Sequence, residues 1–219
     1  MIRTVLAILI IPFALSFLFH GLGVFLKIIL NPAPILPFLF GGGVYGLIWL
    51  FILRRRKRGM WDTFEHELTH VIFCILCLKK VHSFMAGSKA DQSGRLGVVY
   101  HEQASGLRGT LITLSPYFFP TYTAFLLLIR LFVADSALGV FDLFVGVTFI
   151  YHLISNWQEF GFHQSDITSQ TKFFSVVFII LANLIIIPAV LLIVHGEAGS
   201  LLSYLGGGFL GPVGLFFSL

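Results

Sequence analysis

Two histidines and a glutamate in the run His66-Glu67-Leu68-Thr69-His70 have the types and spacing of a metal site. On a helix, positions i and i+4 lie on one face, so both imidazoles can reach a single ion. Glu67 lies on the adjoining surface, where its carboxylate can take a proton from water. A zinc ion lowers the pKa of its bound water towards neutrality, which favours attack on a carbonyl carbon. The run therefore predicts zinc-dependent hydrolysis.

The composition of the chain excludes a soluble domain. Of its 219 residues, 57% are hydrophobic and only 11% are charged, whereas soluble domains carry about 25% charged residues. The net charge of +4 comes without the interleaved basic and aromatic residues of a nucleic-acid-binding module, so we expect no nucleic-acid partner. Cys74 and Cys77 are expected to be small packed residues on one helix rather than extra metal ligands or a disulfide framework.

Long apolar runs predict an all-α integral membrane protein with about five to six transmembrane helices. Three glycines, Gly41 to Gly43, should allow close helix packing in the second span. The segment Ser115 to Pro120 holds two prolines and predicts a kinked or partly unwound start to the third span. The expected spans are residues 4–26, 36–53, 111–133, 138–157 and 173–194, and the apolar tail 196–219 is either a last span or a half-inserted segment.

A polar stretch between residues 79 and 108 interrupts this apolar pattern. Its β-forming residues cluster on both sides of residues 88–94, which are rich in turn formers. The pattern predicts a small β-hairpin directly after the helix that carries His66 and His70.

The distribution of basic residues indicates how the His66–His70 helix meets the membrane. If this helix enters and returns to the same side, 12 of the 14 basic residues face the cytoplasm, leaving only Lys27 and Arg130. Because cytoplasmic loops are enriched in lysine and arginine, this re-entrant arrangement is favoured. It also predicts that the loop with Asp166 lies on the same membrane face as the two histidines.

A catalytic zinc needs three protein ligands and one open position. Asp166 is the favoured third ligand, and His163, three residues earlier, is the next candidate. A different interpretation makes Asp166 the N-cap of the span that begins near Phe173. Further candidates for the third ligand are His82, His101 and His152.

The chain resembles the site-2 protease family of intramembrane zinc metalloproteases. The resemblance covers residues 61 to about 170 and rests on HELTH, the following hairpin, SPYFFP and a late aspartate. It implies that His66, His70 and Asp166 bind zinc, that Glu67 is the general base and that Asn156 contacts the substrate. The segment NWQEFGFHQSDI departs from the family's pattern because it lacks the proline and the glycine after the aspartate.

We therefore expect a single polytopic domain, in the inner membrane of a bacterial cell, that hydrolyses peptide bonds in membrane-embedded or juxtamembrane segments. Its active site would lie near the cytoplasmic face, and its partners would be the lipid bilayer and a membrane protein or peptide substrate. An alternative is a non-catalytic membrane protein, such as a metal-handling transporter or a membrane partner protein. The expected segments are 1–58 with two spans, 59–172 with the metalloprotease-like core, and 173–219 with the last span and tail.

Overall fold

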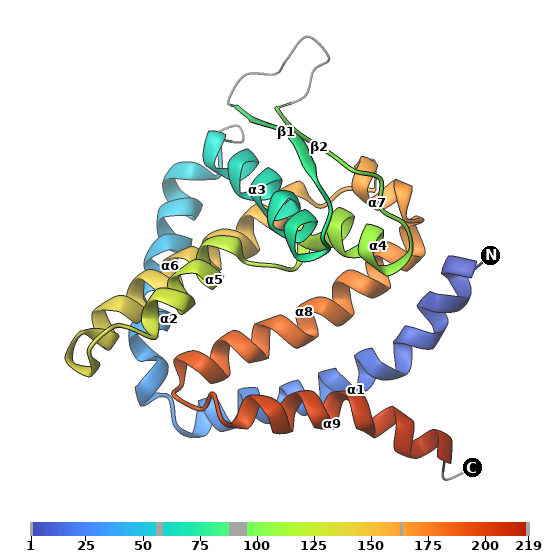
Figure 1. Ribbon diagram of the computed structural model, residues 1–219. Coiled ribbons are helices and arrows are strands. Elements are labelled where there is room, and N and C mark those ends of the chain that lie inside the picture. Colours follow the sequence, from blue (N-terminus) through green and yellow to red (C-terminus); the bar gives the residue numbers. More distant parts are fainter. Residues whose placement is uncertain (1, 56–58, 88–95, 163, 218–219) are drawn as a thin grey trace. The chain divides into compact units, whose positions relative to one another are not determined.

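The computed structural model describes residues 2–55, 59–87, 96–162 and 164–217 (Figure 1). The described part of the chain is mostly helical, at 78%, with one small two-stranded sheet. It divides into two compact units. We call residues 1–39 with 162–219 the terminal unit, and residues 40–161 the central unit. The division into three segments expected from the sequence stays a prediction.

The terminal unit is a group of helices in which α1 packs against both α8 and α9. Its core is aromatic, because the buried ring of Phe17 meets Tyr204 and Phe209 edge to face at 5.5 and 4.8 Å between centroids. A side chain at Gly208 would collide with the Phe17 ring. The elements are α1 (Ile2–Leu30), a 3₁₀ turn (Ala33–Ile35), α7 (Ser165–Ser169), α8 (Lys172–Val194) and α9 (Ser200–Phe217).

A polar network joins the end of α1 to the turn between α8 and α9. Lys27 forms an ion pair with Glu197, which also accepts a hydrogen bond from Ser200 at 3.0 Å. His195 bonds the backbone oxygen of Asn31 at 2.8 Å. The hydrogen bond from Lys27 lowers the pKa of the Glu197 carboxyl below its usual value. These contacts tie together segments that are far apart in the sequence.

The central unit is organised around α3, which contacts the hairpin, α4, the following 3₁₀ turn and α5. The buried Asp142 of α6 accepts two hydrogen bonds from Arg130 of α5, at 2.6 and 3.0 Å. The elements are α2 (Leu36–Ile48), a π-helical turn (Trp49–Leu53), α3 (Met60–Leu76), β1 (Val81–Ala86), β2 (Gly97–His101), α4 (Gly106–Leu114), a 3₁₀ turn (Ser115–Tyr117), α5 (Thr121–Arg130) and α6 (Asp135–Glu159).

The hairpin predicted after the histidine helix is present as the antiparallel pair β1 and β2 (Figure 1). Phe84 lies opposite Val99 in the register, and a bulge falls between Val81 and Ser83. The connecting residues 88–95 lie outside the described part of the chain. Both strands contact α3, so the sheet covers part of the helix that carries the metal-site motif.

The segment Ser115–Pro120 differs from its expected place at the start of a span. It lies between two helices, α4 and α5, whose axes meet at 88°. Pro116 is accommodated in the 3₁₀ turn, and Pro120 occupies the position before the first residue of α5. Proline cannot supply the backbone N–H that a continuous helix needs there, so the chain turns instead of kinking within one helix.

Within the described ranges, four helices are long and apolar enough to cross a membrane. They are α1, the run Ala33–Leu53, α6 and α8; the bent pair of α4 and α5 makes a fifth if it is counted as one span. Five to six spans were expected from the sequence. Among the described residues, neither α3 nor α9 meets the same criteria of length and hydropathy.

The glycine run in α2 allows α6 to approach closely at two of its three positions. A Cβ at Gly41 would lie 2.0 Å from the carbonyl oxygen of Leu143, and one at Gly42 would lie 2.6 Å from the side chain of Ile150. A Cβ at Gly43 would meet nothing within 4 Å. The expected close packing is therefore confirmed for Gly41 and Gly42.

We predict that Gly41→Ala destabilises the protein by about 1–3 kcal/mol, because the backbone of α6 cannot move aside without losing its other contacts. Gly43→Ala, two residues further along the same helix, is the matched control, because a Cβ there would meet nothing within 4 Å. Thermal unfolding of both variants in mild detergent measures the difference. Equal stability of the two variants would contradict the packing described here.

Candidate metal centre

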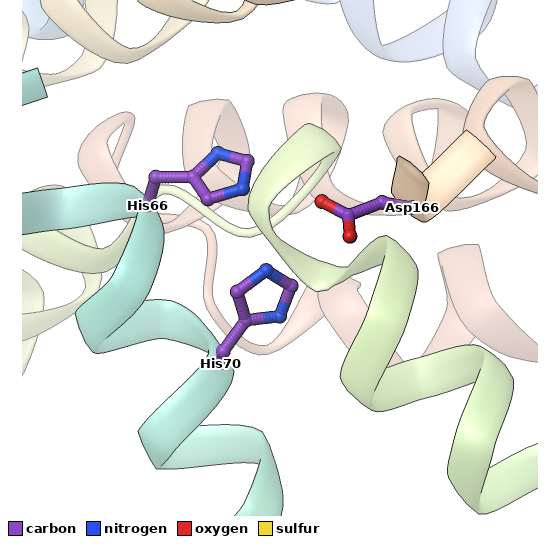
Figure 2. Close-up of side chains that lie close together, drawn as sticks. All are labelled: His66, His70 and Asp166. Carbon is purple, nitrogen blue, oxygen red and sulfur yellow. The ribbon is translucent and has the colours of Figure 1, made fainter. Parts of the chain in front are cut away.

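The two histidines of the motif lie on one side of α3 (Figure 2). Their ring centroids are 5.0 Å apart, and the His70 side chain is buried. The helix begins just before the motif, where the Asp62 carboxylate accepts the backbone N–H of Gly59 at 2.8 Å. This capping bond satisfies one of the free donors at the helix start. The predicted i,i+4 pairing is thus present in the structure.

Each histidine uses its Nδ1 atom to bond another element of the central unit. His66 Nδ1 lies 2.7 Å from Oε2 of Glu159 in α6, and His70 Nδ1 lies 2.7 Å from the carbonyl oxygen of Ile112 in α4. A carbonyl oxygen and an ionised carboxylate can only accept, so both Nδ1 atoms act as donors. In the neutral imidazole this leaves Nε2 with a lone pair, as a metal ligand requires. The donor set therefore fits a zinc ion.

Glu67 lies under the first residue of β2. Its side chain is buried, and a Cβ at Gly97 would lie 2.6 Å from its Cγ and 2.7 Å from its Oε1. The same Cβ would lie 2.7 Å from Cγ2 of Thr63, one turn earlier on α3. The Glu67 carboxylate therefore fits beneath β2 only because residue 97 is a glycine, which has no side chain.

A second set of polar side chains lies between α3 and α6. Glu65 is 3.5 Å from Nδ1 of His152, and Nε2 of His152 accepts a hydrogen bond from the Asn156 amide at 2.9 Å. Glu65, His152 and Glu159 are all buried. Together with His66 and Asn156 they border one small polar cavity. Asn156 thus lies within the polar layer next to the histidine pair.

Aromatic rings lie against His66. The ring of Tyr117 meets the imidazole edge to face at 5.7 Å, and Phe160 contacts Tyr117 at 6.2 Å. Tyr117 is only 2% exposed. Tyr117 belongs to the 3₁₀ turn between α4 and α5. The break between these helices therefore places an aromatic ring against His66.

The other candidates for the third zinc ligand lie on different elements of the chain. Asp166 is in the first turn of α7, in the terminal unit, and is half-buried. The interpretation of Asp166 as the N-cap of the last span is wrong, because Thr171 occupies that position at α8. His101 Nδ1 bonds the carbonyl oxygen of Glu102 at 2.7 Å, and His82 is exposed on β1. His163 falls outside the described residues.

Sequence reasoning missed the polar partners of the motif. Glu159, Glu65 and the imidazole of His152 were not assigned to the site as its supporting groups. A usable signal was present, since acidic residues in an apolar helix are costly unless a partner compensates them. Their pairing could not be read from spacing, because Glu159 is 93 residues from His66.

Comparison with known proteins gave no match. No protein-family model matches the chain, and no curated protein and no solved structure matches it at a significant level.

The contact of Gly97 with Glu67 is testable as an energetic coupling. We predict that Gly97→Ala lowers stability by about 1–3 kcal/mol, because the new methyl group overlaps the Glu67 side chain. Glu67→Ala in the same chain should recover much of the loss, since it removes two of the three close atoms. Thermal unfolding of the two single variants and the double variant measures the coupling.

Val98→Ala serves as the control, because neighbouring strand residues point to opposite faces of the sheet. It should show no coupling to Glu67→Ala. Simple additivity of Gly97→Ala and Glu67→Ala would refute the predicted contact.

Proposed function

We propose that this protein is a zinc-dependent metalloendopeptidase, similar to site-2 proteases, that cleaves peptide bonds in membrane-embedded or juxtamembrane segments. The observation that carries the proposal is the paired use of Nδ1 by His66 and His70. With Nδ1 donating, Nε2 of each neutral ring carries the lone pair that a metal ligand requires, and Glu67 lies on the adjoining face of α3.

Asp166 is the third ligand in this proposal. It belongs to the terminal unit, so its approach to the histidine pair of the central unit is itself part of the proposal. The resemblance to site-2 proteases supports it, because that resemblance implies a late aspartate as the third zinc ligand. Two histidines and a carboxylate are a ligand set that hydrolytic zinc enzymes use.

When bound, zinc would polarise a carbonyl group and lower the pKa of water at its open position. Glu67 would accept the proton of the attacking water and return it to the leaving amine. The aromatic rings of Tyr117 and Phe160 would limit the access of bulk water on the side of His66. Asn156 would contact the substrate or the intermediate, as the resemblance to site-2 proteases implies.

The substrate would be a segment of a membrane protein or a peptide at the bilayer. An α-helical segment hides its carbonyl groups in hydrogen bonds, so it has to unwind locally before attack. Among the described residues, β1 and β2 form a two-stranded sheet that contacts α3, and an extended segment could add to one of its outer edges. The site would be reached from the cytoplasmic side, as the basic residues predict.

The alternative function is a metal-handling transporter. The observation in its favour is the buried polar layer of Glu65 and His152 between α3 and α6, because polar groups inside membrane proteins often line transport paths. Glu67 favours hydrolysis, since a transport site does not need a carboxylate between two i,i+4 histidines. Glu67 variants therefore separate the two functions.

The metal content of purified protein tests the ligands. We expect about one zinc per chain, strong loss in His70→Ala and Asp166→Ala, and full retention in His163→Ala, because three ligands are needed to hold a catalytic zinc. Elemental analysis of well-folded protein measures the ratio. Full zinc in Asp166→Ala with lost zinc in His163→Ala would transfer the ligand role to the histidine.

Glu67→Gln tests the chemistry apart from binding. This change preserves size and polarity but removes the base, so zinc should stay bound while hydrolysis of a membrane peptide substrate falls about 10²–10⁴-fold. Rates are measured on zinc-loaded protein in detergent or liposomes. Undiminished turnover would remove Glu67 from the proposed mechanism, and zinc binding without any hydrolysis by the unaltered protein would favour the transporter.

A further inference from the structure

We propose that Glu159 is a positioning residue of the metal centre. Its carboxylate accepts the Nδ1–H of His66, fixes the orientation of the ring and strengthens Nε2 as a ligand. The inference rests on the proposed function, since it assigns a role toward the same ion. It adds a residue that the motif and the resemblance to site-2 proteases leave unassigned.

The location of Glu159 is unfavourable for a carboxylate that has no compensating partner. The residue is 5% exposed and is the last residue of α6. Burial of a charge costs several kcal/mol unless a partner compensates it. The end of a helix also carries partial negative charge, which disfavours an acidic side chain there. Partners must therefore offset both effects, and His66 is one of them.

Both carboxylate oxygens of Glu159 are in hydrogen-bond contacts. Oε2 lies 2.7 Å from Nδ1 of His66, and Oε1 accepts a hydrogen bond from the hydroxyl of Ser155 at 3.3 Å. Ser155 lies one turn earlier on α6, so the last turn of this helix fixes its own terminal carboxylate. The carboxylate in turn restricts rotation of the His66 ring.

The two histidines are oriented by different kinds of acceptor. His70 bonds a backbone carbonyl, that of Ile112, which carries no net charge. His66 instead donates its Nδ1–H to a carboxylate. A charged acceptor attracts the Nδ1 proton more strongly than a carbonyl oxygen does, and this raises the basicity of Nε2. Partners of this kind typically change metal affinity about 10–100-fold when they are removed. The effect of Glu159 should therefore appear in affinity for the metal.

A plain buried ion pair is the competing explanation. In that case Glu159 would stabilise the contact between α3 and α6 and would leave metal affinity unchanged. The same helix offers a matched example, since the buried carboxylate of Asp142 pairs with Arg130 at the other end of α6. Asp142→Asn therefore controls for the loss of a buried carboxylate in this helix.

The experiment measures zinc affinity by chelator competition on the full chain in detergent, for unaltered protein, Glu159→Gln, Glu159→Ala and Asp142→Asn. We expect affinity to fall about 10–100-fold in Glu159→Ala and less in Glu159→Gln, whose amide oxygen still accepts the Nδ1–H. Asp142→Asn should bind zinc as the unaltered protein does. If Glu159→Ala fails to fold, the isosteric Gln variant carries the comparison.

A second measurement does not depend on metal binding. Nitrogen NMR of the metal-free protein should show His66 protonated at Nδ1, and this preference should weaken in Glu159→Ala. Unchanged zinc affinity in Glu159→Ala, or an equal loss in Asp142→Asn, overturns the inference and leaves the proposed function standing. Failure of the unaltered protein to bind zinc overturns both.

Discussion

Two Nδ1 atoms on α3 must each find an acceptor inside an apolar bundle, and much of the central unit follows from that requirement. An unpaired buried donor costs about 1–3 kcal/mol. The carbonyl oxygen of Ile112 and the carboxylate of Glu159 meet this need from two different helices. Because both acceptors come from outside α3, the helix is held in one rotation about its own axis. The same rotation places Glu67 against the sheet.

The break between α4 and α5 is the second feature that the site depends on. A continuous helix through this segment would carry Tyr117 and Ile112 along one straight axis. The turn at the two prolines instead separates them, so that Ile112 supplies a carbonyl to His70 while Tyr117 covers His66. The cost of the interruption is limited because proline at a helix start loses no hydrogen bond that the helix could have made.

Two glycines, Gly97 and Gly41, allow neighbouring elements of the central unit to approach each other closely. Gly97 lets β2 lie directly on Glu67, and Gly41 lets α2 lie on the backbone of α6. Both contacts depend on a missing side chain rather than on a favourable group. They differ in consequence, since the first shapes the space of the proposed base and the second fixes the helix that carries Glu159.

The sequence by itself determined the local features. The HELTH spacing predicted two histidines on one helical face, the β-forming residues around a polar turn predicted the hairpin, and long apolar runs predicted most of the long helices. Each of these depends on residues a few positions apart, whose periodicity reports directly on the backbone. The glycine run likewise predicted close packing, though the sequence did not show which glycines would take part.

Only the tertiary structure decided which groups meet the motif. The carboxylate of Glu159 and the backbone of Gly97 lie 93 and 30 positions from the α3 residues that they contact, and no periodicity links such distances. The bend at Pro116 and Pro120 was also settled by the fold, because proline permits either a kink or a turn and the packing of α4 and α5 on α3 selects one. Pairing between distant buried groups depends on the energy of the whole packed unit, which spacing along the chain does not encode.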